Sequence, residues 1–305
     1  MTRKKFDIKI NHDTILRKMG ENLKTISYKD GSAYSRIEYL SVPIIKYNIF
    51  DKYENIVHGF STRLGGVSKE HLSSLNLSFS RGDLRENVLE NHKRLGEAIG
   101  YNHEKLVFSD QVHDVRIHRV MEDDMGKGIM KESDIKETDG LITNIPGIPL
   151  ITFYADCVPL YFYDPVQKVV ALAHSGWKGT VNKIGAVMVS KMKELYGSEP
   201  SDIICAIGPS ICKSCYEVSA DVADMFKEAF THEEYEDIVE EKGNEKYLLD
   251  LHKACKYNFI NAGINESNIA MPDYCTCCNS QMLFSHRASK GMRGNLAAVI
   301  MLKEQ

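Results

Sequence analysis

The sequence has no excess of positive charge and no long apolar run. Its 305 residues include 38 lysines and arginines against 42 aspartates and glutamates, which gives a formal net charge of -4. Binding to a phosphate backbone generally requires a basic surface, so this balance argues against a nucleic-acid partner. No window approaches the roughly 18 consecutive apolar residues of a membrane-spanning helix, so we expect no membrane span.

The N-terminus also lacks the apolar segment of a secretory signal. The first residues, MTRKKFDIKINHDTIL, are basic, but no apolar run of about 7 to 15 residues follows them. The eight cysteines are scattered along a long chain, which favours free thiols or metal ligands over a disulfide framework. We therefore predict a cytoplasmic protein.

Neither an internal repeat nor a low-complexity linker divides the chain. Residues 1–37 are polar and unpatterned, which predicts an N-terminal arm, whereas residues 38–305 are predicted to form one catalytic domain. A hydrophobic fraction of 43% suffices for a sizeable core. Short runs rich in β-branched and aromatic residues alternate with helical patterns, so we predict a single mixed α/β domain.

Helical spacing of apolar residues predicts helices over 84–99, 179–195, 219–230 and 250–262. In the first of these, Asp83 is the predicted N-cap and Gly100 the predicted C-cap. The acidic segments 121–137 and 232–246 are predicted to be exposed loops. The run LVFSDQVH, residues 106–113, reads as a strand that ends in a histidine.

Three metal-capable side chains stand where apolar runs end or begin: His113, Cys157 and His174. They are 44 and 17 residues apart along the chain, so only the fold can bring them together. Two imidazoles and one thiolate supply three ligands of a tetrahedral zinc site, and a fourth position open to water or substrate is typical of a catalytic centre. The alternative is two hydrogen-bonded core histidines and a small buried cysteine.

Two turns that contain glycine are candidates for anion binding. In HSGWKG, Gly176 and Gly179 allow a tight turn after His174, and the amides of the helix that follows suit a phosphate. In STRLGGVS, Arg63 beside a glycine pair is a candidate phosphate clamp. Turns that simply require glycine explain both stretches equally well.

An ordered series of motifs resembles a known family. The chain contains, in this order, HGFSTRLGGVS, SLNLS followed by RGD, QVH, TDGLIT, ADCVPL, AHSGWKGT, GPSI with CYEV, and CT with LFSHR. This series is similar to that of the laccase-domain, or polyphenol oxidase, family, and the resemblance runs from about residue 57 to residue 299. It implies that His113, Cys157 and His174 bind one zinc ion.

The resemblance also implies a fold and an activity. The implied fold is α/β (α+β), a single domain in which two mixed β-sheets are sandwiched between helical layers, as in the catalytic domain of cytotoxic necrotising factor. The implied activity is that of a purine nucleoside phosphorylase on adenosine, inosine and methylthioadenosine, with adenosine deamination in the same pocket. A purine nucleoside and inorganic phosphate would be the substrates. Hydrolytic editing of peptidoglycan precursors is a further activity linked to the family.

Three further residues have expected roles in such a pocket. Arg63 and Arg287 are expected to orient phosphate together with zinc, because guanidinium groups match phosphate oxygens. Asp139 of TDG is a candidate acid for proton transfer in deamination, and a turn-forming aspartate is the alternative. The chain departs from the usual family motifs at Lys178 and His286, which puts the phosphate or base contacts at these positions in doubt.

Copper, a metal-free hydrolase and a zinc knuckle are the remaining alternatives. One copper bound by two histidines and a cysteine stays open, but the paired His-x-His motifs of four-copper laccases are absent among the eleven histidines. Cys157 and a histidine are also the nucleophile and base of a possible cysteine hydrolase. Finally, Cys212-x-x-Cys215 and Cys275-x-x-Cys278 are candidate zinc knuckles, although 59 residues separate the pairs instead of the usual ~15 to 20.

Overall fold

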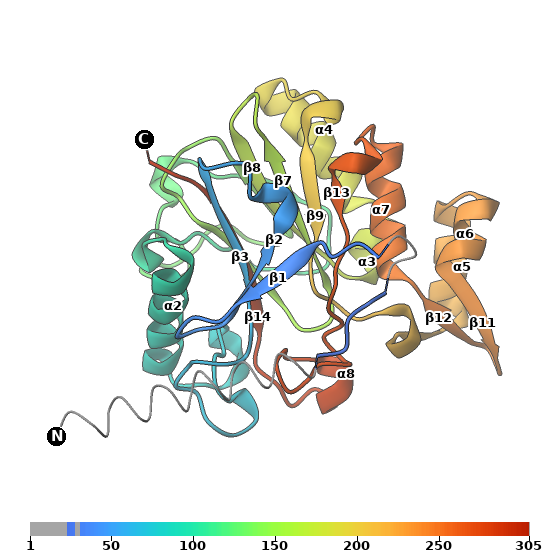
Figure 1. Ribbon diagram of the computed structural model, residues 1–305, viewed down its shortest axis with the longest axis horizontal. Helices are drawn as coiled ribbons and strands as arrows, with labels where there is room; N and C mark the ends of the chain where they lie inside the picture. The colour runs from blue at the N-terminus through green and yellow to red at the C-terminus, as the bar shows by residue number, and fades with distance from the viewer. Residues whose placement is uncertain (1–22, 28–30, 305) are drawn as a thin grey trace.

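The computed structural model describes residues 23–27 and 31–304, whose strands form two large sheets and one small sheet (Figure 1). The large sheets have the orders β1-β2-β3-β14-β6 and β13-β9-β7-β8-β5-β4, and the small sheet has the order β10-β12-β11. The strands are β1 (Ser35–Glu38), β2 (Ile44–Tyr47), β3 (Ile56–Ser61), β4 (Ile117–Arg119), β5 (Gly140–Thr143), β6 (Leu150–Tyr154), β7 (Val158–Asp164), β8 (Val169–Ser175), β9 (Ile204–Ile207), β10 (Glu217–Ser219), β11 (Val239–Gly243), β12 (Lys246–Leu249), β13 (Ile269–Ala270) and β14 (Leu296–Leu302).

Seven α-helices lie within the described residues. They are α2 (Arg85–Ile99), α3 (Trp177–Val181), α4 (Ile184–Tyr196), α5 (Ala220–Ala229), α6 (His232–Ile238), α7 (Leu251–Asn261) and α8 (His286–Ser289). In Figure 1, α2 lies at the left and α4 and α7 lie at the top and right, with the strands between them. Within residues 23–27 and 31–304, no helix is both long and apolar enough to cross a bilayer.

The two large sheets differ in strand direction. Every neighbouring pair in the five-stranded sheet is antiparallel. The six-stranded sheet is mixed, because β4 pairs parallel to β5 and β13 pairs parallel to β9 while its other pairs are antiparallel. The prediction of two mixed sheets is therefore correct for one sheet and wrong for the other, and it missed the small third sheet. Apolar patterning reports which residues are buried but carries no information on strand direction.

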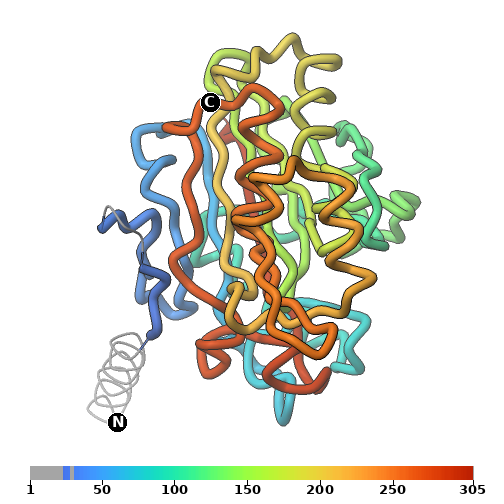
Figure 2. Tube along the Cα trace, turned by 90° about the vertical axis from the view of Figure 1, so that its right-hand side faces the viewer, coloured from blue at the N-terminus to red at the C-terminus, as the bar shows by residue number. Residues whose placement is uncertain are grey.

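Three apolar clusters hold these layers together. The first lies between the two large sheets and joins Ile300 of β14 to Leu172 of β8. The second covers the other face of the six-stranded sheet, where the rings of Phe162 and Phe259 are 5.2 Å apart. The third packs α2 onto the five-stranded sheet and includes Leu95. Figure 2 shows the layers from another side, with the blue N-terminal strands to the left of the green and yellow segments that carry β7, β8 and β9.

The four predicted helices are present with shifted ends. Leu84 occupies the N-cap of α2, and the Asp83 carboxylate instead accepts hydrogen bonds from the Leu84 amide and from neighbouring side chains. Gly100 ends α2 in the left-handed conformation, with φ of 96°, as predicted. The helix predicted after HSGWKG is divided into α3 and α4, because Lys183 between them adopts a left-handed conformation with φ of 60°.

Two further predictions are wrong. The acidic segment 232–246 contains α6, the whole of β11 and the first residue of β12 instead of a loop. Thr231 and Glu234 form a capping box at the start of α6, and this pattern is readable in the sequence. Residues 106–113 contain only an isolated bridge at Val107 instead of a strand.

The predicted arm over residues 1–37 lies largely outside the described residues. Within its described part, the amide and the hydroxyl of Ser35 both donate to Asp273 Oδ2 at 2.6 Å. The Lys24 amide donates to Asn279 Oδ1 at 2.8 Å. These bonds connect the N-terminal segment to a segment near the end of the chain, and the domain boundary at residue 37 stays a prediction.

Candidate active site

The six-stranded sheet brings Asp139, Cys157 and His174 to one edge. Cys157 directly precedes β7, and His174 lies opposite Pro159 in the antiparallel pair of β7 and β8. Asp139 directly precedes β5, which pairs with the other side of β8. Strand pairing therefore gathers residues that are far apart in the sequence.

His113 reaches the same edge from a loop that Asp139 holds in place. The Asp139 carboxylate accepts hydrogen bonds from the backbone amides of residues 112–114 at 3.0, 3.1 and 2.9 Å. The Gln111 side chain pairs with the backbone of Phe153 on the edge strand β6, at 2.7 and 3.0 Å. His113 itself has a φ of 66°, a conformation uncommon outside glycine and often found at functional sites.

The ligand atoms of His113, Cys157 and His174 lie within 4.8 Å of one another. Cys157 Sγ is 3.8 Å from His113 Nε2, and the two imidazole centroids are 4.9 Å apart. His174 Nδ1 lies 2.7 Å from Asp139 Oδ1, so Nε2 is the ring nitrogen that remains available on the side of Cys157. A carboxylate in this position fixes the ring and the tautomer of a metal-binding histidine. The donor set of two imidazoles and one thiolate suits zinc or copper.

The charges of this group stabilise one another. Burial would raise the pKa of the Cys157 thiol, but the positive charge of His174 and the hydrogen bond to His113 lower this pKa to about 6. Burial opposes protonation of His174, but the Cys157 thiolate and Asp139 raise the pKa of His174 to about 9. At neutral pH the metal-free group therefore holds a thiolate, which is the form of cysteine that binds a metal.

Gly176 leaves the space that the three side chains need. A Cβ atom at residue 176 would lie 2.7 Å from His113 Cδ2 and 3.3 Å from Cys157 Sγ. A Cβ atom at Gly179 would come no closer than 3.5 Å to its neighbours. Of the two glycines in HSGWKG, only Gly176 is therefore required by the site.

The three side chains line a cavity of about 390 Å³, a size usual for small-molecule sites. Phe79, Phe108 and Phe153 supply an aromatic wall, in which the Phe108 ring centroid lies 6.2 Å from that of Phe79 and 5.1 Å from that of Phe153. Most of the other lining residues are polar or charged: Ser78, Ser80, Arg81, Ser109, Asp110, Gln111, Ser133, Lys136, Arg293 and Asn295.

Two arginines that the sequence analysis did not single out, Arg81 and Arg293, lie in this cavity. Both donate to Asn295 Oδ1, and the bond from Arg81 Nε is 3.2 Å long. Burial and the charge of Arg81 lower the pKa of Arg293 to about 10, and Arg293 Nε has no hydrogen-bond partner in the described part of the chain. Two neighbouring guanidinium groups favour an anion. The only signal in the sequence was the RGD motif that follows SLNLS.

Arg63 lies outside the set of residues that line the cavity. Its guanidinium group donates to the backbone carbonyl of Ser73 at 2.7 and 2.9 Å and to that of Ser280 at 2.9 Å. It also lies 4.4 Å from the centroid of the Phe284 ring. These contacts hold two loops together, so they lend no support to the predicted phosphate clamp at Arg63.

Arg287 and Asp139 likewise have structural contacts. Arg287 donates to the backbone carbonyls of Cys215 and Glu217 at 3.2 and 3.0 Å and lies outside the set of cavity-lining residues. Asp139 has no exposed surface, and its oxygens accept bonds from His174 and from the loop amides. Asp139 therefore positions the two histidines, and these contacts leave it no direct access to a substrate.

The fold and the site define an α/β protein with a candidate histidine and cysteine metal centre in a cavity that also contains two arginines. Residues 57–303 match the family model described as "Multi-copper polyphenol oxidoreductase laccase". Because this match spans most of the chain, the protein belongs to that family. The resemblance read from the ordered motifs is thereby confirmed.

Curated relatives and solved structures agree with this assignment. The "Purine nucleoside phosphorylase YlmD" of Bacillus subtilis is 35% identical over 252 residues, which cover 82% of this chain and 90% of that protein. The "Purine nucleoside phosphorylase LACC1" of Mus musculus is 33% identical over 259 residues, or 82% of this chain and 56% of that protein. The crystal structure of YlmD from Geobacillus stearothermophilus superposes on this chain with a TM-score of 0.82 and 33% sequence identity. The match covers 90% of this chain and 100% of that chain.

Proposed function

We propose that this chain is a zinc-dependent purine nucleoside phosphorylase that acts on adenosine, inosine and methylthioadenosine. The observation that carries the proposal is a single cavity that combines His113, Cys157 and His174 with two adjacent arginines and an aromatic wall. These features suit, in that order, a metal ion, inorganic phosphate and a purine base. The names of the relatives from Bacillus subtilis and Mus musculus support the same activity.

The residues of the trio fit zinc. Cys157 is a thiolate at neutral pH, Asp139 holds the ring of His174, and Gly176 keeps the approach to His113 and Cys157 open. Zinc bound to the two imidazoles and the thiolate would supply a Lewis acid with one position available to a substrate oxygen. Copper is the alternative metal for the same donor set, and the metal content of the purified protein separates the two.

Arg81 and Arg293 are the phosphate ligands in this proposal. They replace Arg63 and Arg287, whose guanidinium groups are already bonded to backbone carbonyls. Asn295 Oδ1 accepts from both Arg81 and Arg293 and so holds the two groups side by side. A bound phosphate would reduce the repulsion between them and would be held ready to attack the ribose.

The aromatic wall would hold the purine. Flat rings such as those of Phe79, Phe108 and Phe153 offer apolar faces and edges to a heterocycle. In phosphorolysis a phosphate oxygen forms a bond to the ribose C1′ as the bond from C1′ to the purine nitrogen breaks, and the purine leaves with the electron pair. Lys136 lines the same cavity and is the candidate donor of a hydrogen bond to the departing purine.

A second candidate function rests on the ionised pair in the metal-free trio. The pKa of Cys157 is lowered to about 6 and that of His174 is raised to about 9, as in hydrolases that use a cysteine nucleophile and a histidine. Such an enzyme would work without metal. The two candidates therefore differ in the effect of a chelator on activity.

Product analysis with the full chain tests the proposal. Zinc-loaded protein is incubated with inosine, adenosine or methylthioadenosine, with and without inorganic phosphate. We expect free base and the sugar 1-phosphate only in the presence of phosphate, and loss of both in Cys157→Ala. Release of free ribose without phosphate would contradict phosphorolysis. Ammonia from adenosine would reveal the predicted deamination, and cleavage of peptidoglycan precursors would reveal the editing activity linked to the family. Oxidation of phenols by copper-loaded protein would favour the copper alternative, a polyphenol oxidase.

A further inference from the structure

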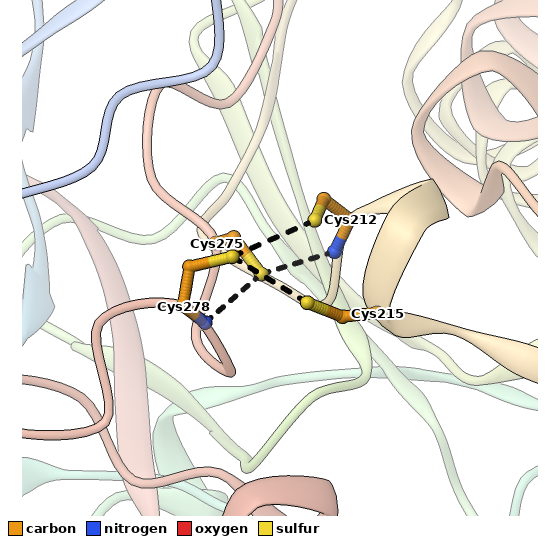
Figure 3. Close-up of side chains that lie close together, drawn as sticks. All are labelled: Cys212, Cys215, Cys275 and Cys278. Atoms are coloured by element: carbon orange, nitrogen blue, oxygen red, sulfur yellow. Dashed lines mark hydrogen bonds between the residues drawn. The ribbon is translucent and has the colours of Figure 1, made fainter.

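A second group of metal-capable side chains lies outside the set of residues that line the active-site cavity. The sulfur atoms of four cysteines all lie within 4.8 Å of one another: Cys212, Cys215, Cys275 and Cys278. Figure 3 shows that they converge from two segments of the chain. One segment joins β9 to β10, and the other follows β13. We propose that this four-cysteine cluster is a structural zinc site.

The spacing of the sulfurs fits a tetrahedral metal centre better than a disulfide. Cys278 Sγ lies 3.4 Å from Cys215 Sγ and 4.0 Å from Cys212 Sγ. A disulfide requires about 2.05 Å between its sulfurs. Four sulfurs held about 2.3 Å from one tetrahedral zinc ion lie about 3.8 Å from each other. The observed spacing therefore needs little adjustment to bind a metal.

Backbone amides already point at one of the sulfurs. The amides of Cys212 and Cys278 donate to Cys275 Sγ at 3.2 and 3.4 Å (Figure 3). Such amide donors suit a metal-bound sulfur, because the positive end of each N–H dipole faces its negative charge. They also fix the orientation of a metal ligand. Cys275 is 1% exposed, so the sulfur that accepts from both amides belongs to the most buried cysteine of the cluster.

The composition of the cluster points to a structural ion. Four thiolates fill the coordination of a tetrahedral zinc ion and leave no position for a substrate, which is typical of structural sites. Soft sulfur ligands also select zinc over calcium or magnesium. Cys277 belongs to the same CTCC run but lies outside the cluster and packs against the apolar core. The convergence is thus restricted to the two Cys-x-x-Cys pairs.

The cluster joins two distant parts of the chain next to the active centre. Ser210 forms a parallel bridge with Cys275. The next residue, Thr276, donates from its hydroxyl to Asp156 Oδ1 at 2.6 Å, and Asp156 directly precedes Cys157. A metal ion at the cluster would fix this connection and so support the position of the catalytic cysteine.

Metal analysis of the full chain tests this proposal independently of the phosphorylase activity. Protein loaded with zinc is dialysed against a weak chelator, and the metal per chain is measured by mass spectrometry. We expect two zinc ions in the wild type, one in Cys157→Ala and one in Cys278→Ser. Cys277→Ser is the matched control and should keep both. Full zinc content in Cys278→Ser, iron instead of zinc, or a disulfide within the cluster of the freshly purified protein would overturn the proposal.

Cobalt substitution covers the case in which Cys278→Ser fails to fold. In the Cys157→Ala variant, cobalt should show the intense sulfur-to-metal charge-transfer bands of a tetrahedral site with four thiolates. Absence of these bands would overturn the structural site. Because Cys157→Ala lacks a ligand of the active-site trio, this result reports on the four-cysteine cluster alone.

Discussion

His174 Nδ1 lies 2.7 Å from Asp139 Oδ1, and the same carboxylate accepts hydrogen bonds from the backbone amides of residues 112–114. One buried carboxylate therefore orients one histidine through its ring and the other through its loop. Hydrogen bonds to a buried carboxylate are strong because the local dielectric is low. The geometry of the metal trio thus depends on a residue that touches none of the proposed substrates.

We expect Asp139→Asn to weaken zinc binding at the trio about 10- to 100-fold. The amide keeps the size of the side chain, but it loses the negative charge and one acceptor. Competition with a chromophoric chelator measures the affinity in Cys278→Ser, so that only the trio is observed. The control is Asp134→Asn, since Asp134 is exposed and pairs with Lys127. Equal affinities in the two variants would contradict the positioning role of Asp139.

Gly176→Ala should abolish zinc binding at the trio while the protein stays folded. The added Cβ would lie 2.7 Å from His113 Cδ2 and 3.3 Å from Cys157 Sγ, so the side chains must move apart. Gly179→Ala is the matched control, because its Cβ would meet no atom closer than 3.5 Å. Zinc content and circular dichroism of both variants check this. A normal zinc content in Gly176→Ala would show that the trio tolerates displacement.

Arg293→Ala and Arg81→Ala should each raise the phosphate KM. A charged hydrogen bond contributes about 1.5 to 3 kcal/mol, so we expect an increase of about 10- to 100-fold. Arg119→Ala removes the same charge at an exposed site beside Tyr196 and should leave the phosphate KM unchanged. Initial rates at varied phosphate with saturating inosine provide the measurement. An increase in Arg63→Ala, with none in Arg81→Ala and Arg293→Ala, would return the phosphate role to the residue first predicted.

The stability of the protein should fall in acid partly because of His92. This ring is fully buried, its Nε2 lies 2.8 Å from the Leu77 carbonyl oxygen, and its Nδ1 has no partner within the described residues. Burial lowers the pKa of His92 to about 4, below the value of about 6.5 in an unfolded chain. The unfolded state therefore binds the proton first. The contribution of His92 to the free energy of unfolding is fully present above pH 6.5 and is lost as the pH falls toward 4. At pH 5 the loss is about 2 kcal/mol.

Urea denaturation of metal-free protein at pH 7 and pH 5 isolates this contribution. His92→Gln keeps a donor for the Leu77 carbonyl but cannot be protonated. We expect the free energy of unfolding to change with pH by about 2 kcal/mol less in this variant than in the wild type. The same pH dependence in both proteins would show that His92 is already accessible to protons in the folded state.

The sequence predicted the members of the trio but not the way in which they meet. Cys157 directly precedes β7 and His174 lies near the end of β8, two strands whose apolar character is evident. The resemblance read from the ordered motifs predicted both as ligands. His113 was assigned to the end of a strand, because residues 106–113 have the composition of one. Its actual position depends on a carboxylate that comes 26 residues later in the chain, and local patterning contains no information on such a contact.

The cavity arginines show the same limit. Arg63 stands beside two glycines in a conspicuous turn, whereas Arg81 stands in a short motif to which no role was given. Whether a guanidinium group faces a cavity or a carbonyl is decided by loops such as the one that includes Ser280, which is distant in sequence. The strands of the fold were easier to predict, because strands such as β7 and β8 are buried along their whole length and appear in the sequence as continuous apolar runs.

Strand β14 lies between β3 and β6 in the five-stranded sheet, although it follows both of them in the chain. On a ribosome, β3 and β6 therefore emerge well before the strand that joins them. At about 5 to 20 residues per second, the interval between β6 and β14 is on the order of ten seconds. During that time β3 and β6 each have an edge without its partner strand, and unpaired edges promote aggregation. The five-stranded sheet is therefore completed only when β14, an interior strand that follows the other four in the chain, has been made.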